Sequence, residues 1–155
     1  MALLATLMAV VAPRISGSIR RQNLDQEAVR FVALTEYARD QAVSQGVPMV
    51  VWLDAETSEF GAHPKRGFLV RADRSVHYRL GEDIEFDLRN SVLPGGPQAA
   101  IEMGSDGLLA THSLPEVWLV DRTGAAVGVV TTTNGWGYEV VQEWDYATRI
   151  QSIRR

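Results

Sequence analysis

The chain begins with a run of apolar residues that leads into a stretch with helical periodicity. Residues 1–12 carry no charge and are almost wholly apolar, and Pro13 ends the run. Over residues 15–45, apolar positions recur at intervals that place them on one face of an α-helix. Gly46 then stands where a helix end favours glycine. The pattern predicts one long helix, bent or loosened at Pro13, with core positions at Leu24, Ala28, Phe31, Ala38 and Ala42.

After Gly46 the apolar pattern changes to a period of two or to short apolar runs, with turn residues between them. Such segments are typical of antiparallel strands, and no repeated alternation of strand and helix is visible. The sequence therefore predicts an α+β fold, with a long helix over residues 1–45 packed on a β-rich head over residues 46–155. The expected strands are Met49–Asp54, Gly67–Arg71, Val76–Leu80, Ile84–Leu88, Ala100–Met103, Val117–Val120, Val127–Thr132 and Tyr138–Gln142, with Arg149–Ile153 pairing at an edge.

The apolar start is too short to cross a bilayer alone. As a helix, residues 1–12 extend about 18 Å, whereas the hydrocarbon core is about 30 Å thick. A cleaved signal peptide is an alternative, but no Lys or Arg precedes the run and the helical pattern continues after Pro13. An exposed apolar tail is costly in water, so it requires a membrane or a partner. We expect a membrane or filament-core location for Leu3, Leu4, Leu7, Met8, Val10, Val11 and Pro13.

Composition narrows the classes of function. The chain has 155 residues, of which 46% are hydrophobic and 22% charged, as in a single globular domain. A net charge of -4 argues against a general nucleic-acid binder, because phosphate binding depends on clustered Lys and Arg. Cysteine is absent, which excludes disulfides, thiolate zinc sites and cysteine nucleophiles.

No sequence motif predicts catalysis or a metal site. His63, His77 and His112 lack the spacing of metal-binding motifs, and no nucleophile elbow is present. Acidic and apolar residues alternate over residues 82–88, which predicts a half-buried strand with carboxylates on its exposed face. We therefore expect no cofactor, no metal and no enzyme. The rival enzyme hypothesis, a small α+β hydrolase behind a cleaved signal peptide, has no nucleophile–base motif in its favour.

Tryptophan and arginine residues supply the candidate contacts of the head. Trp52 and Trp118 fall in strand patterns, so we expect them in the core. Trp136 lies between two glycines in an expected loop, where an exposed indole can anchor a partner. The C-terminal segment is basic, and it is either a solvated terminus or a nucleic-acid contact through Arg149, Arg154 and Arg155.

The order of these features resembles type IV pilin-like proteins, and in detail the minor pseudopilins of the GspH/FimT family. Leu3–Pro13 resembles the inner part of the family's N-terminal helix, and Ala28–Gly46 resembles its amphipathic part. Ile101–Gly107 resembles the family's strand and Asp-Gly turn, and Val117–Leu119 with Gly128–Val130 resembles its paired strands. The family's basic leader and the Glu near its mature N-terminus are not in the sequence. We therefore expect that the start is truncated.

The resemblance implies a structural subunit of the type II secretion pseudopilus, which helps to export folded proteins across the outer membrane. It implies a single-pass anchor in the bacterial inner membrane, a periplasmic head, and other pseudopilins as filament partners. Secreted substrates or the secretin are further implied contacts. The leader cleavage and methylation site of the family would lie outside this sequence. The alternative is a FimT-like minor pilin that binds DNA or another partner during uptake or pilus assembly.

Overall fold

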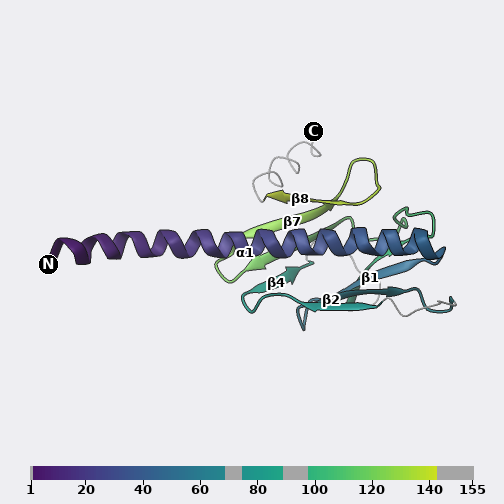
Figure 1. Cartoon of the computed structure of the whole chain (residues 1–155), viewed down its shortest axis with the longest axis horizontal. Coiled ribbons are helices and arrows are strands. Elements are labelled where there is room, and N and C mark those ends of the chain that lie inside the picture. Colours follow the sequence, from purple (N-terminus) through teal and green to yellow (C-terminus); the bar gives the residue numbers. More distant parts are fainter. Residues whose placement is uncertain (1, 69–74, 89–97, 143–155) are drawn as a thin grey trace.

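The computed structural model describes the backbone of residues 2–68, 75–88 and 98–142, and the side chains of residues 20–68, 75–88 and 100–142. The helix α1 (Ala2–Gln45) is 44 residues long. It continues without interruption through Pro13, where the sequence predicts a bend or a loosened turn. Figure 1 shows α1 lying across the strands and extending past them toward the N terminus.

The C-terminal end of α1 is a glycine-capped turn. Gly46 has a φ of 66°, and the N–H of Val47 donates to the C=O of Ala42 at 3.2 Å. This bond across the left-handed residue satisfies a carbonyl that the last helical turn leaves free. The cap turns the chain directly into the first strand, as Gly46 predicts.

The strands of the head form two antiparallel four-stranded sheets. The first sheet has the order β3-β2-β1-β5 and the second the order β4-β6-β7-β8. The α+β fold predicted from the sequence is therefore confirmed. The strands are β1 (Met49–Asp54), β2 (Glu59–Pro64), β3 (Val76–Arg79), β4 (Ile84–Asp87), β5 (Gln98–Met103), β6 (Glu116–Asp121), β7 (Ala126–Thr131) and β8 (Tyr138–Gln142).

The sequence predicts most of these strands but misses β2. β1 and β8 have the predicted bounds, and β3 to β7 differ from prediction by at most two residues at either end. β2 has the sequence EFGAHP, which lacks an apolar alternation, yet β1 and β3 pair with it on either side. The strand predicted at Gly67–Arg71 is wrong at its start, because residue 67 lies in a turn and residue 68 in a bend. Residues 69–71 and the edge strand predicted at Arg149–Ile153 lie outside the described residues.

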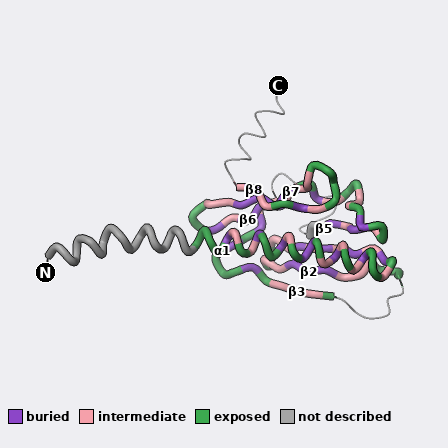
Figure 2. Tube along the Cα trace, turned by 45° about the horizontal axis from the view of Figure 1, so that its top comes forward, coloured by how far each residue is buried: buried purple, intermediate pink, exposed green. Residues whose placement is uncertain are grey.

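The core lies where α1 meets both sheets. The buried positions of α1 include all five that the periodicity predicts, and in Figure 2 they follow the side of the helix that faces the strands. Phe31 of α1, Phe60 of β2 and Phe86 of β4 form a triangle, with ring centroids 5.6, 5.9 and 5.8 Å apart. One residue from each layer meets here, so the triangle joins the helix to both sheets. The buried α1 positions are Leu24, Ala28, Phe31, Leu34, Thr35, Ala38 and Ala42.

The two tryptophans predicted for the core differ in burial. Trp118 is buried, as predicted, in a small cluster with Val130 and Val141. Trp52 is only half-buried, because it points away from the inward-facing positions of β1. Its indole lies against Gly61 and stacks on His77, with ring centroids 5.5 Å apart. The head therefore carries aromatic surface outside its core as well.

Candidate assembly surfaces

The first part of α1 contains all the residues predicted for a membrane or filament core. Their side chains lie outside the described residues, and among the described positions of α1, from residue 20 onward, Leu24 is the first that is buried. Among the residues described, no helix is both long and apolar enough to cross a membrane. The membrane or core location remains a prediction for Leu3, Leu4, Leu7, Met8, Val10, Val11 and Pro13.

Trp136 is displayed by the tight loop between β7 and β8. The N–H of Thr132 donates to the C=O of Gly137 at 2.9 Å, which closes the loop. The Asn134 side chain accepts hydrogen bonds from the Thr132 hydroxyl at 2.6 Å and from the N–H of Trp136 at 3.1 Å. The loop is fixed by its own hydrogen bonds, yet the Trp136 side chain is 59% exposed. Its predicted exposure is confirmed, and its role as a partner contact remains a prediction.

A second turn, which follows β5, places Leu108 next to the C-terminal end of α1. The N–H of Gly104 donates to the C=O of Leu108, and the N–H of Leu108 donates to Asp106 Oδ1. Gly107 packs so closely on α1 that a Cβ atom there would lie 2.9 Å from Val43 Cγ2. A larger residue would force Val43 to shift, and the φ of 79° at Gly107 is a conformation that residues with a Cβ rarely adopt.

The two turns and the end of α1 together form what we call the distal surface: Arg39, Val43, Leu108 and Trp136. Val43 and Leu108 are 55% and 45% exposed, and with Trp136 they line a groove of about 460 Å³. Arg39 Nη1 donates to the C=O of Trp136 at 3.3 Å, while its Nε lies 4.0 Å from Asp40. The carboxylates of Asp40 and Asp106 line the same groove, so its exposed apolar side chains lie beside charges of both signs.

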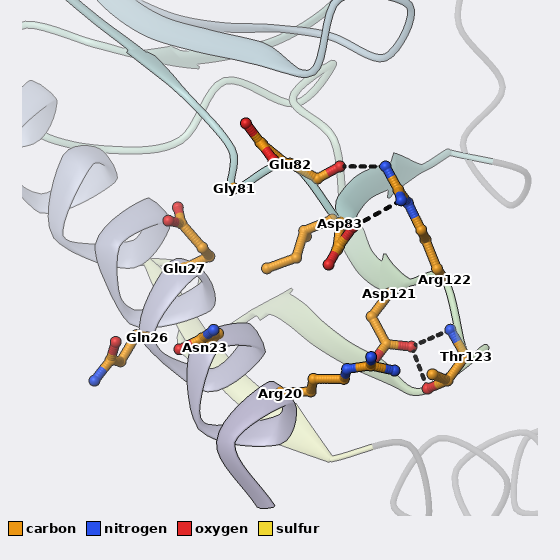
Figure 3. Close-up of a pocket in the computed structure, with 11 residues that line it drawn as sticks. Arg20, Asn23, Gln26, Glu27, Gly81, Glu82, Asp83, Asp121, Arg122 and Thr123 are labelled. Atoms are coloured by element: carbon orange, nitrogen blue, oxygen red, sulfur yellow. Dashed lines mark hydrogen bonds and ion pairs between the residues drawn. The ribbon is translucent and has the colours of Figure 1, made fainter. Parts of the chain in front are cut away.

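A pocket of about 320 Å³ lies beside residues 20–27 of α1, where the helix begins to pack on the head and away from the distal surface. We call it the neck pocket. Three elements build it, namely α1, the turn before β4 and the turn between β6 and β7. Figure 3 shows Arg20 reaching from α1 toward Asp121 and Thr123. The lining residues are Arg20, Asn23, Gln26, Glu27, Gly81, Glu82, Asp83, Ile84, Asp121, Arg122 and Thr123.

Hydrogen bonds and an ion pair fix the walls of the neck pocket. Arg122 Nη1 lies 3.0 Å from Asp83 Oδ1, and Nη2 donates to the C=O of Glu82 at 3.1 Å, so Arg122 ties the two turns together. Asp121 Oδ1 accepts hydrogen bonds from the Thr123 hydroxyl and from the N–H groups of Thr123 and Ala125. The Thr123 hydroxyl above all holds the pKa of Asp121 below its usual value, and these bonds outweigh the opposing effect of burial. A charged Asp121 thus stabilises this turn.

Two glutamates on the outer face of the first sheet each bind a cation and a histidine. Arg79 binds Glu59 and lowers its pKa, with His77 Nε2 at 3.2 Å as a second partner. Lys65 Nζ donates to Glu102 at 2.6 Å and lowers its pKa, with His112 Nε2 at 3.2 Å. Such exposed pairs contribute little stability.

The three histidines are not brought together. His77 and His112 belong to the two separate glutamate clusters, and His63 Nδ1 lies 2.8 Å from the C=O of Pro64. No group of three or more His, Asp or Glu side chains suited to a metal occurs within residues 20–68, 75–88 and 100–142. Each of the three histidines therefore has a polar partner close by in the structure.

The predicted contact residues fall into two sets. Trp136 lies on the distal surface, whereas Arg149, Arg154 and Arg155 lie outside the described residues. The neck pocket was not predicted from the sequence. Its walls combine residues about 100 positions apart, and each polar residue alone has the pattern of a solvated turn or helix face.

Comparisons with known proteins reveal a structural likeness. No protein-family model matches the chain, and no curated protein matches it in sequence. Its fold is similar to that of the minor pseudopilin EpsH from the type 2 secretion system of Vibrio cholerae, with a TM-score of 0.54. The match covers 77% of this chain and 97% of EpsH, at 14% sequence identity. At this identity the likeness concerns the fold alone, and the chain has the fold of a pseudopilin, with a long helix packed on a β-rich head.

Proposed function

We propose that this chain is a minor pseudopilin, a structural subunit of a type II secretion pseudopilus that helps to export folded proteins across the outer membrane. The observation that carries the proposal is the division of α1. Among the described side chains, from residue 20 onward, the positions of α1 buried against the sheets run from Leu24 to Ala42, whereas residues 2–12 of the same helix are uncharged and almost wholly apolar. An apolar helical segment continuous with a folded head is the arrangement that a helix-cored filament requires.

The physical chemistry of the N-terminal segment supports assembly. Helices that leave lipid gain little hydrophobic energy, so they associate through close packing that small residues allow. Ala2, Ala5, Ala9 and Ala12 provide such residues among larger apolar ones. In this proposal the segment sits in the bacterial inner membrane before assembly, the head lies in the periplasm, and the partners are other pseudopilins. The subunit acts through binding and not through catalysis.

A deletion in the source cell tests the proposal. The gene is removed, and the distribution of secreted proteins between periplasm and medium is measured, with the wild-type chain and Leu7→Arg as complementing copies. We expect exoproteins to accumulate in the periplasm, the wild type to restore export, and Leu7→Arg to fail, because a charge at a helix centre costs about 3 kcal/mol in a membrane. Val29→Arg is the matched control, since Val29 is 58% exposed on the same helix.

The same deletion strain distinguishes the secretion role from the alternative role in DNA uptake. Loss of DNA uptake with unchanged export would replace the secretion proposal by the FimT-like one. That alternative rests on Arg149, Arg154 and Arg155, and no contact among the described residues bears on it. Unchanged export and unchanged uptake would reject both proposals.

A further inference from the structure

The three walls of the distal surface are held to one another by contacts within the chain. Arg39 of α1 donates to the C=O of Trp136, which joins the helix to the loop between β7 and β8. The turn after β5 approaches the same end of α1, where a Cβ atom on Gly107 would lie 2.9 Å from Val43 Cγ2. The groove between these walls, about 460 Å³, has the size of a ligand pocket. A site that is formed in advance loses little entropy on binding.

The groove of the distal surface contains exposed apolar side chains from all three walls. Val43 comes from α1, Leu108 from the turn after β5, and Trp136 from the loop between β7 and β8. Single exposed apolar residues are common, but several that converge on one groove are typical of an interaction site. Tryptophan in particular is enriched at the centres of protein interfaces. A large apolar side chain therefore fits this groove better than a polar one.

The charges that line the distal surface are mainly acidic. Asp40 and Asp106 line the groove against the single guanidinium group of Arg39. An adjoining hollow of about 160 Å³, which Arg39 and Trp136 also line, adds Glu36. The described lining of the two hollows thus carries three carboxylates against one guanidinium group, a net charge of -2. The side chain of Asp40 is 75% exposed, so a Lys or Arg side chain of a partner can reach it.

We propose that the distal surface docks a basic and apolar segment of a different protein. One large apolar side chain of that segment packs against Trp136 and Leu108, and flanking Lys or Arg side chains contact Asp40 and Glu36. The carboxylates favour a basic segment over an acidic one, because like charges repel. Two distal surfaces have the same sign, so a symmetric contact between two copies of this chain is disfavoured. The inference goes beyond the proposed function, because it uses the head and not the N-terminal part of α1.

Binding of three synthetic peptides to the full chain tests the inference. The chain is purified in detergent, and fluorescence anisotropy measures the dissociation constant of each dye-labelled peptide, with detergent alone as the blank. The basic peptide has the sequence Gly-Lys-Leu-Leu-Lys-Gly. The acidic peptide has Glu in place of Lys, and the polar peptide has Ser in place of Leu. We expect the basic peptide to bind about ten-fold more tightly than either of the others, because each of them loses one of the two kinds of contact.

Three variants locate the binding. Trp136→Ala should weaken binding of the basic peptide about 30-fold, as expected for loss of a central aromatic anchor. Asp40→Lys should weaken binding of the basic peptide and strengthen binding of the acidic one, because it reverses a charge on the rim of the groove. Val29→Ala is the matched control and should change neither affinity, since Val29 is exposed on the same helix and does not line the groove.

Three results would overturn the inference. Equal affinities for the basic and acidic peptides would reject the basic segment, and an affinity that Trp136→Ala leaves unchanged would place the binding elsewhere. Self-association of the chain in sedimentation velocity, abolished by Trp136→Ala, would make the occupant a second copy. The peptide measurements decide the docking site alone, whereas the deletion strain decides the pseudopilin role, so the two proposals fail separately.

Discussion

Replacing Phe31 by Ala should uncouple α1 from the head. Phe31 is fully buried, and its ring centroid lies 5.6 Å from Phe60 of the first sheet and 5.9 Å from Phe86 of the second. Removal of a buried phenylalanine side chain costs about 3–5 kcal/mol through lost transfer energy and the cavity left behind. The two aromatic pairs add about 0.5–1.5 kcal/mol each beyond burial. The loss is a large part of the stability of a typical domain, about 5–15 kcal/mol.

Urea unfolding of the full chain in detergent, followed by tryptophan fluorescence, measures this loss. With a slope of about 2 kcal/mol per molar urea, a loss of about 4 kcal/mol moves the midpoint by about 2 M. Phe31→Leu should cost less, because it keeps most of the volume. Val29→Ala, at a position that is 58% exposed, should change the free energy of unfolding by no more than about 0.5 kcal/mol.

A double-mutant cycle between Phe31→Ala and Phe86→Ala extends the test. Residues in contact show interaction energies of about 0.5–3 kcal/mol, whereas distant residues give additive losses. If Phe31→Ala destabilises the chain no more than Val29→Ala, or if the cycle shows no coupling, the aromatic triangle does not join helix and sheets as described.

Three further changes test the head. Gly61→Val should destabilise it by about 1–3 kcal/mol in thermal unfolding, because a Cβ atom would lie 2.3 Å from the C=O of Val76 and within 3.0 Å of the Trp52 ring. Unchanged stability would show that the indole is not packed there. Tyr138→Phe should cost about 1 kcal/mol, since the buried hydroxyl donates to the C=O of Leu114 at 2.5 Å; an equal melting temperature would contradict this bond. Asp121 has a pKa below its ordinary 3.8, so its stabilisation is complete above that pH and is lost as pH falls below it. The wild type should therefore exceed Asp121→Asn in stability at pH 7 and lose this advantage progressively as the pH falls below 3.8, and a pH-independent difference would refute the charge effect.

The helix was predictable because its signal is periodic. Leu24, Ala28 and Phe31 recur at helical spacing, and a glycine cap follows the last turn. Trp136 was predictable as an exposed residue because glycines flank it on both sides. These features depend on a few neighbouring residues, which a single sequence displays directly.

β2 and the neck pocket were not predictable, because both depend on residues far apart in the chain. β2 contains a glycine and ends in proline, and it becomes a strand because β1 and β3 supply hydrogen-bond partners on both sides. The neck pocket requires the ion pair of Arg122 with Asp83, which lie 39 positions apart. Neither residue has a pattern that distinguishes it from a solvated turn residue.

Co-isolation from membranes tests most directly the claim that the chain works by assembly through α1. The tagged full chain is expressed in its source cell, the membranes are solubilised, and the pilin-like proteins that accompany it are quantified for the wild type, Leu7→Arg and Val29→Arg. We expect the wild type and Val29→Arg to retain these partners and Leu7→Arg to lose them. The urea midpoint of the head should stay unchanged, because the described buried positions of α1, Leu24 to Ala42, lie at least 17 residues beyond Leu7. Retention of the same partners by Leu7→Arg, or their absence from the wild type, would contradict that claim.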